Sequence, residues 1–145
     1  MNKLIAISLL VWILGFSGIK NSTTYADVVL FLSTDETNSI EYSFDYNCLN
    51  YSIDLVNNAK KESMNASIVI VFLEDGERHS FVSFETIDRG VVYVEPQNDG
   101  FFTSIKIGDK LCDTVWGCIE GGVISNYFLN QHCTKLFGCI GVFTK

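Results

Sequence analysis

The stretch from Ser67 to Glu95 reads SIVIVFLEDGERHSFVSFETIDRGVVYVE and decides the predicted fold. Three of its segments are apolar runs or alternate between apolar and polar residues, as strands do: residues 67–73, 79–84 and 91–94. Asp75-Gly76 and Asp88-Arg89-Gly90 lie between these segments, and Asp and Gly favour the tight turns that join antiparallel strands. The stretch therefore predicts an antiparallel meander.

A helix is predicted before the meander, from about Cys48 to Ser63. Its apolar or small residues recur at helical spacing: Leu49, Ser52, Ile53, Val56 and Ala59. Asn47 is the expected N-cap, with Asp45 as the alternative. The helix therefore places the thiol of Cys48 in its first turn.

Three further segments are expected around this unit. Residues 101–107 are predicted to form a fourth strand, and residues 40–44 alternate and are expected to be extended. The apolar run 27–32 is either a strand or the tail of an anchor segment. The predicted fold class is α+β, with a core helix that carries the cysteine packed on an antiparallel sheet.

The residues with the most informative chemistry lie on different predicted elements: Cys48, His79 and Glu95. Cys48 opens the helix, where the helix dipole and unpaired N–H groups favour a thiolate and can bind an oxyanion. His79 opens the second strand, and Glu95 ends the third strand just before the only proline, Pro96. A histidine oriented by a carboxylate can take the proton of a thiol, so this set predicts a nucleophile, its base and an orienting acid.

Two aspartates are alternatives for the orienting acid, Asp99 first and then Asp88. Asp88 lies in a turn, where Asp is common for local reasons. Each residue of the set also has a structural explanation. A cysteine is often a buried structural thiol, and the histidine and the glutamate can be surface groups at strand ends.

These motifs resemble the transglutaminase-like branch of the papain-like cysteine hydrolases, in which a strand beginning Gly-x-His-Ala-Trp is followed by a hairpin and a strand ending in Asp-Pro. GERHSF at 76–81 matches the histidine strand, Glu95-Pro96 matches the Asp-Pro position, and Tyr46-Asn47-Cys48 matches the cysteine at the start of the core helix. Glu replaces the usual Asp, and Phe81 replaces the usual Trp. The resemblance covers about residues 44–99. It implies a transglutaminase-like or papain-like core and a Cys-His-Glu triad.

The N-terminus predicts an exported protein. Residues 1–26 are expected to be a signal peptide or an N-terminal membrane anchor, and residues 27–145 a single domain. Cleavage is expected after Ala26, and Gly15-Phe16-Ser17 is a competing site. The formal net charge of −7 argues against nucleic-acid binding. Sequons at Asn21, Asn50 and Asn65 fit a secreted or cell-surface glycoprotein, with Asn50 expected to be unmodified.

Four of the five cysteines lie in a tail over about residues 108–145: Cys112, Cys118, Cys133 and Cys139. An even set in an exported protein predicts two disulfides of unassigned connectivity, which leaves Cys48 as the free thiol. The alternative is a zinc site formed by these thiolates, with or without His132. The Cys-x5-Cys spacing is longer than that of common zinc knuckles, so we expect no metal and no cofactor.

The leading functional hypothesis is an exported thiol hydrolase or acyltransferase that acts on a peptide or amide bond of a peptide or protein substrate. Cys48 would attack the carbonyl, His79 would move the proton, and Glu95 would hold the imidazole. The alternative is a catalytically inactive extracytoplasmic binding or surface-structure module on the same fold. A zinc-dependent interaction module is the third hypothesis.

Overall fold

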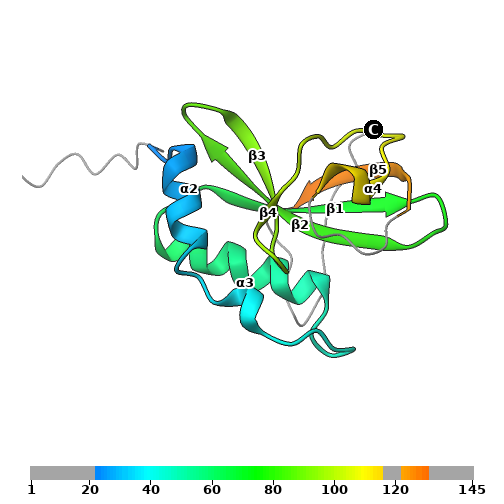
Figure 1. The fold of residues 1–145 in the computed structure, drawn as a ribbon, viewed down its shortest axis with the longest axis horizontal. Coiled ribbons are helices and arrows are strands. Elements are labelled where there is room, and N and C mark those ends of the chain that lie inside the picture. The colour runs from blue at the N-terminus through cyan, green and yellow to red at the C-terminus, as the bar shows by residue number, and fades with distance from the viewer. Residues whose placement is uncertain (1–21, 116–121, 131–145) are drawn as a thin grey trace, which may run out of the picture.

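The computed structural model of the protein describes residues 22–115 and 122–130. Its elements follow one another as α2 (Tyr25–Leu32), η1 (Thr37–Ser39), α3 (Cys48–Lys61), β1 (Ala66–Leu73), β2 (Arg78–Thr86), β3 (Gly90–Glu95), β4 (Gly100–Phe101), α4 (Leu111–Thr114) and β5 (Ile124–Asn130). The strands form one five-stranded sheet in the order β4-β3-β2-β1-β5, and every neighbouring pair is antiparallel (Figure 1).

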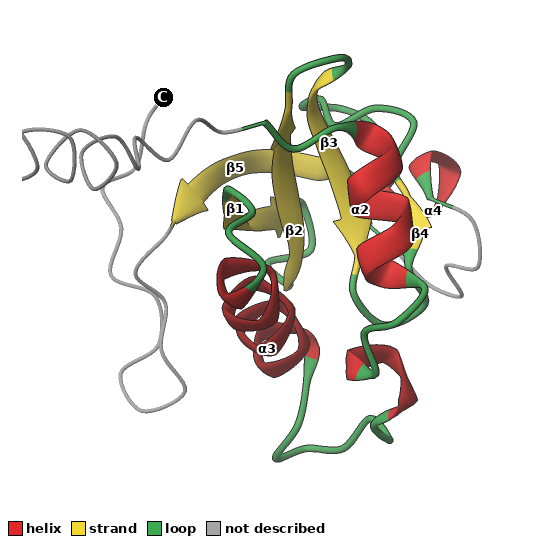
Figure 2. Ribbon diagram, turned by 90° about the vertical axis from the view of Figure 1, so that its left-hand side faces the viewer, coloured by secondary structure: helices red, strands yellow, loops and turns green. Residues whose placement is uncertain are grey.

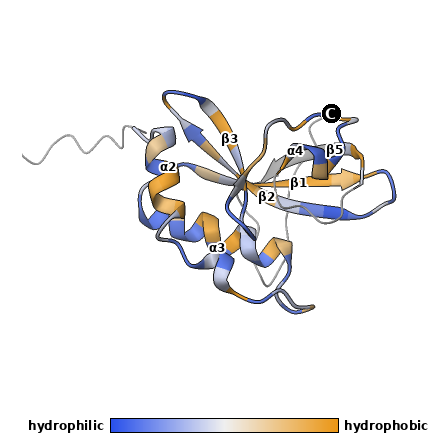
Figure 3. Ribbon diagram, in the orientation of Figure 1, coloured by the Kyte–Doolittle hydropathy of each residue, from blue (hydrophilic) through white to orange (hydrophobic). Residues whose placement is uncertain are grey.

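The meander formed by β1, β2 and β3 confirms the three strands predicted from the sequence. In its register, Val71 pairs with His79, and Val82 pairs with Val94. β1 is apolar along its length (Figure 3) and is buried at almost every position. This burial follows from its place inside the sheet, between β2 and β5.

Helix α3 begins at the predicted residue. The side-chain oxygen of Asn47 accepts a hydrogen bond from the N–H of Leu49 at 3.1 Å, and the side chain of Asn50 accepts one from the N–H of Asn47 at 3.1 Å. This reciprocal cap satisfies N–H groups that the first turn otherwise leaves unpaired. Leu55 of this helix is fully buried, so truncating it to Ala would cost about 2–5 kcal/mol.

The sheet buries apolar side chains on both faces. One cluster contains residues of α2, α3 and the meander, among them Phe31, Leu55, Ile68, Val82 and Phe84. The other cluster joins β1, β2 and β5 to the segment between β4 and β5, and includes Val69, Phe81, Phe102, Leu111 and Ile124. The strands therefore contribute to both cores, whereas α3 contributes to one.

The predicted fold class, a transglutaminase-like or papain-like α+β core, is wrong. The molecule is mainly an antiparallel sheet that curls into a half-barrel, and its helices are few (Figure 2). The cause lies after Glu95. β5 pairs with β1, and residues 102–115 cover the second face of the sheet, so most of the core comes from strands and loops.

Two local predictions of strands are also wrong. Residues 27–32 belong to helix α2 rather than to a strand, because Thr24 caps the helix and the carboxylate of Asp27 accepts a hydrogen bond from the N–H of Thr24 at 2.8 Å. Residues 40–44, which the sequence predicts to be extended, lie in a loop, and the backbone of Ile40 is extended. Of residues 101–107 only Phe101 lies in a strand, because β3 and β4 pair at just two positions.

The predicted domain start at residue 27 falls inside α2. The carbonyl of Thr23 accepts a hydrogen bond from the N–H of Ile87 at 3.0 Å, and the rings of Tyr25 and Phe101 lie 5.0 Å apart. A cut after Ala26 would remove these contacts. The leader itself lies mostly outside the described residues and stays a prediction. No helix within residues 22–115 and 122–130 combines the length and apolarity needed to span a membrane.

Candidate functional site

The three predicted site residues come together at one end of the meander. Cys48 is half-buried in the first turn of α3, and His79 lies in β2, one residue after its start. Glu95 is the last residue of β3 and is 7% exposed. Two strand ends and one helix end therefore carry the three side chains, as the sequence predicted.

His79 is bound to the carboxylate of Glu95. Its Nε2 lies 2.6 Å from Oε2 of Glu95, a distance typical of a strong, charge-assisted hydrogen bond. The other carboxylate oxygen of Glu95 accepts from the backbone N–H of Gln97 at 3.4 Å and from its Nε2 at 3.3 Å. Donors on both oxygens fix the plane of the carboxylate and, through it, the imidazole.

The second partner of His79 is the thiol of Cys48: hydrogen bonding and charge attraction between the two side chains shift the pKa values of both. Because Nε2 is engaged with Glu95, the ring presents Nδ1 to the sulfur. Burial raises the pKa of the Cys48 thiol, but hydrogen bonding and charge attraction from His79, with further hydrogen bonds from Ser80, outweigh burial and leave that pKa lowered. Burial lowers the pKa of His79, but its bonds to Cys48 and Glu95 outweigh burial and raise that pKa. These opposite shifts favour a thiolate beside an imidazolium.

An aromatic side chain covers the imidazole of His79, as the sequence indicated. Phe81 is fully buried, and its ring centroid lies 6.3 Å from that of His79. It packs in turn on Phe102, with ring centroids 4.4 Å apart. This contact keeps water from one side of the imidazole.

The two alternative acids lie elsewhere. The carboxylate of Asp99 accepts a hydrogen bond from the side chain of Asn38 at 2.6 Å, and that of Asp88 accepts one from the N–H of Tyr25 at 2.8 Å. Glu95 is thus the acid that contacts His79. Neither aspartate has a described contact with the imidazole.

A groove opens over the thiol. It is lined by Tyr42, Phe44, Asn47, Cys48, Gly76, Glu77 and Arg78, and encloses about 900 Å³. One wall is aromatic, because Tyr42 is 58% exposed and Phe44 is 96% exposed. The other wall is the hairpin turn between β1 and β2. Cys48 therefore faces a surface of the size and mixed polarity that an extended chain can occupy.

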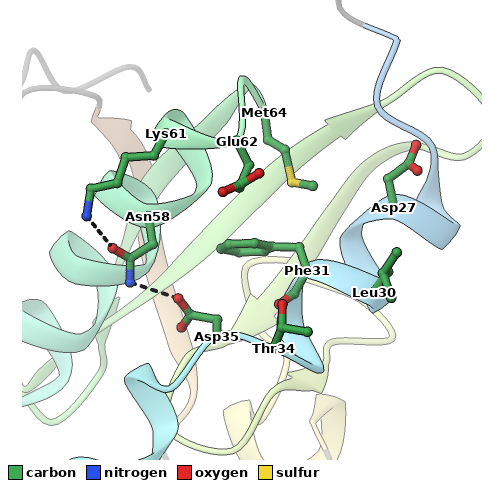
Figure 4. Close-up of a pocket in the computed structure, with 9 residues that line it drawn as sticks. All are labelled: Asp27, Leu30, Phe31, Thr34, Asp35, Asn58, Lys61, Glu62 and Met64. Carbon is green, nitrogen blue, oxygen red and sulfur yellow. Dashed lines mark hydrogen bonds between the residues drawn. The ribbon is translucent and has the colours of Figure 1, made fainter.

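A second pocket lies between α2 and α3, away from the thiol (Figure 4). Asn58 links its polar groups, since its amide donates to Asp35 at 2.8 Å and its carbonyl accepts from Lys61 at 3.0 Å. Phe31 and Met64 supply the apolar part of the lining. These polar groups bond one another, so the pocket offers none of the reactive chemistry found at Cys48.

Residues that sequence reasoning missed also belong to the site. Ser80 contacts the thiol, Ser52 contacts Ser80, and Tyr42 and Phe44 line the groove. The alternation at residues 40–44 was interpreted as extended backbone and was given no role in the site. The position of Ser80 directly after the histidine was the available signal.

The cysteine-rich tail is described in part. Cys112 is disulfide-bonded and Cys48 is free. Cys118, Cys133, Cys139 and His132 lie outside the described residues, so the two-disulfide arrangement and its connectivity stay predictions. Within the described ranges, no group of three or more His, Cys, Asp or Glu side chains could hold a metal ion.

Comparison with known proteins assigns no family. No family model and no curated protein matches the chain. Eight chains of solved structures match it. One is the lectin of Polyporus squamosus bound to the epitope Neu5Aca2-6Galb1-4GlcNAc, at 13% identity and a TM-score of 0.48, over 55% of this chain and 33% of the lectin chain. Another is the "PSL1a-E64 complex", at 14% identity and a TM-score of 0.49, over 55% of this chain and 34% of the other. The chain thus matches about a third of the length of each.

Proposed function

We propose that the protein is a cysteine-nucleophile hydrolase or acyltransferase that acts on a peptide or amide bond. One observation carries the proposal: the imidazole of His79 bridges the Cys48 thiol and the Glu95 carboxylate, with 2.6 Å between Nε2 and Oε2. A thiol at a helix N-terminus, a histidine and an orienting acid are the parts that acyl transfer through a thioester requires. The proposal rests on this geometry and on no relative.

The reaction begins with attack by the thiolate of Cys48 on the substrate carbonyl carbon, which forms a C–S bond and an oxyanion. The imidazolium of His79 then gives its proton to the leaving nitrogen, and the C–N bond breaks. The amine leaves, and an acyl-thioester remains on Cys48. Neutral His79 next takes a proton from water, the hydroxide oxygen attacks the thioester, and the C–S bond breaks to release the acid. An amine in place of water gives acyl transfer.

The oxyanion has a donor ready at the helix terminus. The cap formed by Asn47 serves N–H groups farther along the first turn of α3, and no described hydrogen bond uses the N–H of Cys48. A free backbone N–H at the positive end of a helix stabilises developing negative charge. The nucleophile and this oxyanion donor thus belong to the same residue.

The groove supports a substrate with a large apolar side chain next to the scissile bond. Phe44 and Tyr42 expose aromatic surface beside Cys48, and burial of such surface on binding contributes about 25 cal/mol per Å² of apolar area. Glu77 and Arg78 on the other wall provide polar contacts for a peptide backbone. We propose a peptide or protein as the substrate. The disulfide at Cys112 supports an extracytoplasmic location, because disulfides persist in oxidising compartments.

Labelling with a peptide vinyl sulfone that carries a phenylalanine beside the reactive group tests this proposal. We expect one adduct per chain, located on Cys48 by peptide mapping. The His79→Ala variant should label at least about tenfold more slowly. Phe44→Ala should raise the probe concentration that gives the half-maximal labelling rate, with little effect on the maximal rate. Absence of an adduct on folded protein, or equal labelling of the His79→Ala variant, would overturn the proposal in favour of an inactive binding module.

A further inference from the structure

Within the described residues, the start of β2 next to Cys48 has no strand partner on the side of β3. β2 and β3 pair from Thr86 opposite Gly90 to Val82 opposite Val94, and the ladder ends there. Continued by two residues, the register would bring Ser80 opposite Pro96. Proline has no N–H to donate, so the sequence itself ends the ladder at this point.

The alternation of the β2 backbone directs the N–H of Ser80 toward this open edge. The N–H of Leu73 donates to the carbonyl of Glu77 at 2.9 Å, and the N–H of Glu85 donates to the carbonyl of Asn65 at 3.0 Å. Odd-numbered residues of β2 thus bond toward β1, because alternate residues of an antiparallel strand bond to opposite neighbours. The N–H of Ser80 therefore points the other way, toward the open edge beside Cys48, and it helps to lower the pKa of the Cys48 thiol.

The hydroxyl of Ser80 also helps to lower the pKa of that thiol, and it belongs to a buried polar network that reaches the backbone of Cys48. Ser80 is 3% exposed, and its Oγ lies 3.3 Å from the Oγ of Ser52, which is fully buried. The Oγ of Ser52 also lies 3.0 Å from the carbonyl oxygen of Cys48, one turn earlier in α3. The three residues thus form a buried polar contact between the first turns of α3 and the start of β2. A buried hydroxyl held in this way keeps one orientation.

We propose that Ser80 is a positioning residue that holds the thiolate of Cys48 against His79 through its backbone N–H and its hydroxyl. This role rests on the proposed function. The backbone donor exists because Pro96 ends the ladder, and the side-chain donor exists because Ser52 supports it. Ser80 thus orients the sulfur of Cys48, as Glu95 orients the imidazole of His79.

The pH dependence of Cys48 alkylation tests this role without any substrate. Iodoacetamide is applied under non-reducing conditions from pH 5 to pH 10 to the full chain and to its variants. Ser80→Ala removes the hydroxyl and should slow alkylation at pH 6.5 by about three- to tenfold and move the profile to higher pH. Ser80→Thr keeps a hydroxyl and should restore most of the parent profile.

Ser52→Ala is the matched control, since it removes a buried hydroxyl of the same network that does not contact the sulfur. It should lower the melting temperature as Ser80→Ala does, with a smaller change in the alkylation profile. A folded Ser80→Ala variant with the parent profile would overturn this role and leave the proposed function standing. A parent profile like that of an ordinary thiol, near pH 8.5, would overturn both.

Discussion

Glu95 and Asp99 lie four residues apart, and both are carboxylates partly removed from water, yet their hydrogen-bond partners differ. Glu95 has its Oε2 2.6 Å from Nε2 of His79, which carries a positive charge when protonated. Asp99 accepts a hydrogen bond from the uncharged amide of Asn38. Burial, with repulsion from Asp35 as the smaller cause, raises the pKa of Asp99 to about 6. Burial of a carboxylate therefore does not by itself indicate a catalytic role. A hydrogen bond to a histidine, such as that between Glu95 and His79, is the more informative feature.

Glu95→Gln gives the largest expected effect on reactivity. Its amide has one acceptor atom, but donors face both carboxylate oxygens, His79 on one side and Gln97 on the other. Either orientation of the amide loses a bond, and the charge that stabilises the imidazolium is lost in both. Alkylation of Cys48 at neutral pH should slow by about tenfold or more, measured under pseudo-first-order conditions.

Glu95→Asp is the control for this change. It keeps the charge but shortens the side chain by one methylene, so it should retain more reactivity than the amide variant. If Cys48 of the Glu95→Gln variant reacts like that of the parent while the melting temperature is unchanged, Glu95 does not act on His79. The contrast with Asp99 is then wrong.

Asp99→Asn should change stability and leave reactivity alone. Because the folded-state pKa of Asp99 is raised to about 6, the charged carboxylate destabilises the fold above that pH, and this penalty vanishes below the unfolded-state value of 3.8. Asn also suits the positive φ of 57° at this residue. After a discount for the solvent exposure of this side chain, the free energy of unfolding of the variant should be higher by about 1 kcal/mol at pH 8.

Thermal unfolding at several pH values measures this gain. It should shrink as the pH falls from about 6 toward 4. A slower alkylation of Cys48 in this variant would instead show that Asp99 acts on the site, against the contrast drawn here.

Asp88→Asn should have the smallest effect. Its amide oxygen can still accept the N–H of Tyr25, and only the favourable charge at the N-terminus of α2 is lost. We expect a destabilisation of about 0.3–1 kcal/mol in chemical denaturation and an unchanged alkylation rate. If Asp88→Asn slows the alkylation of Cys48, Asp88 rather than Glu95 orients the imidazole of His79.

The sequence was most informative where local chemistry and pattern agreed. Asn47 and Asn50 form the cap that places Cys48 in the first turn of α3, and the Asp-Gly turn together with the alternation at residues 79–84 defines the meander. The end of β3 at Glu95 followed from the proline after it. These local features suffice to bring the three site residues together.

The rest of the fold depends on contacts that the sequence pattern does not encode. β5 pairs with a strand more than fifty residues earlier, and its segment was interpreted as part of a disulfide tail. The run 28–32 is apolar throughout, so its periodicity could not separate strand from helix, and the cap at Thr24 was overlooked. The role of Ser80 depends on which edge of β2 is open, which requires the register.

The central claim is that His79 stabilises a thiolate at Cys48, and the pH dependence of Cys48 alkylation in the parent and in His79→Ala tests it most directly. We expect the parent to react with iodoacetamide well below pH 8.5, the ordinary range of a thiol. Removal of the imidazole should move the profile to higher pH, because burial then opposes ionisation without a cationic partner. A parent profile at or above that of a free thiol, or one that His79→Ala leaves in place, would contradict the claim.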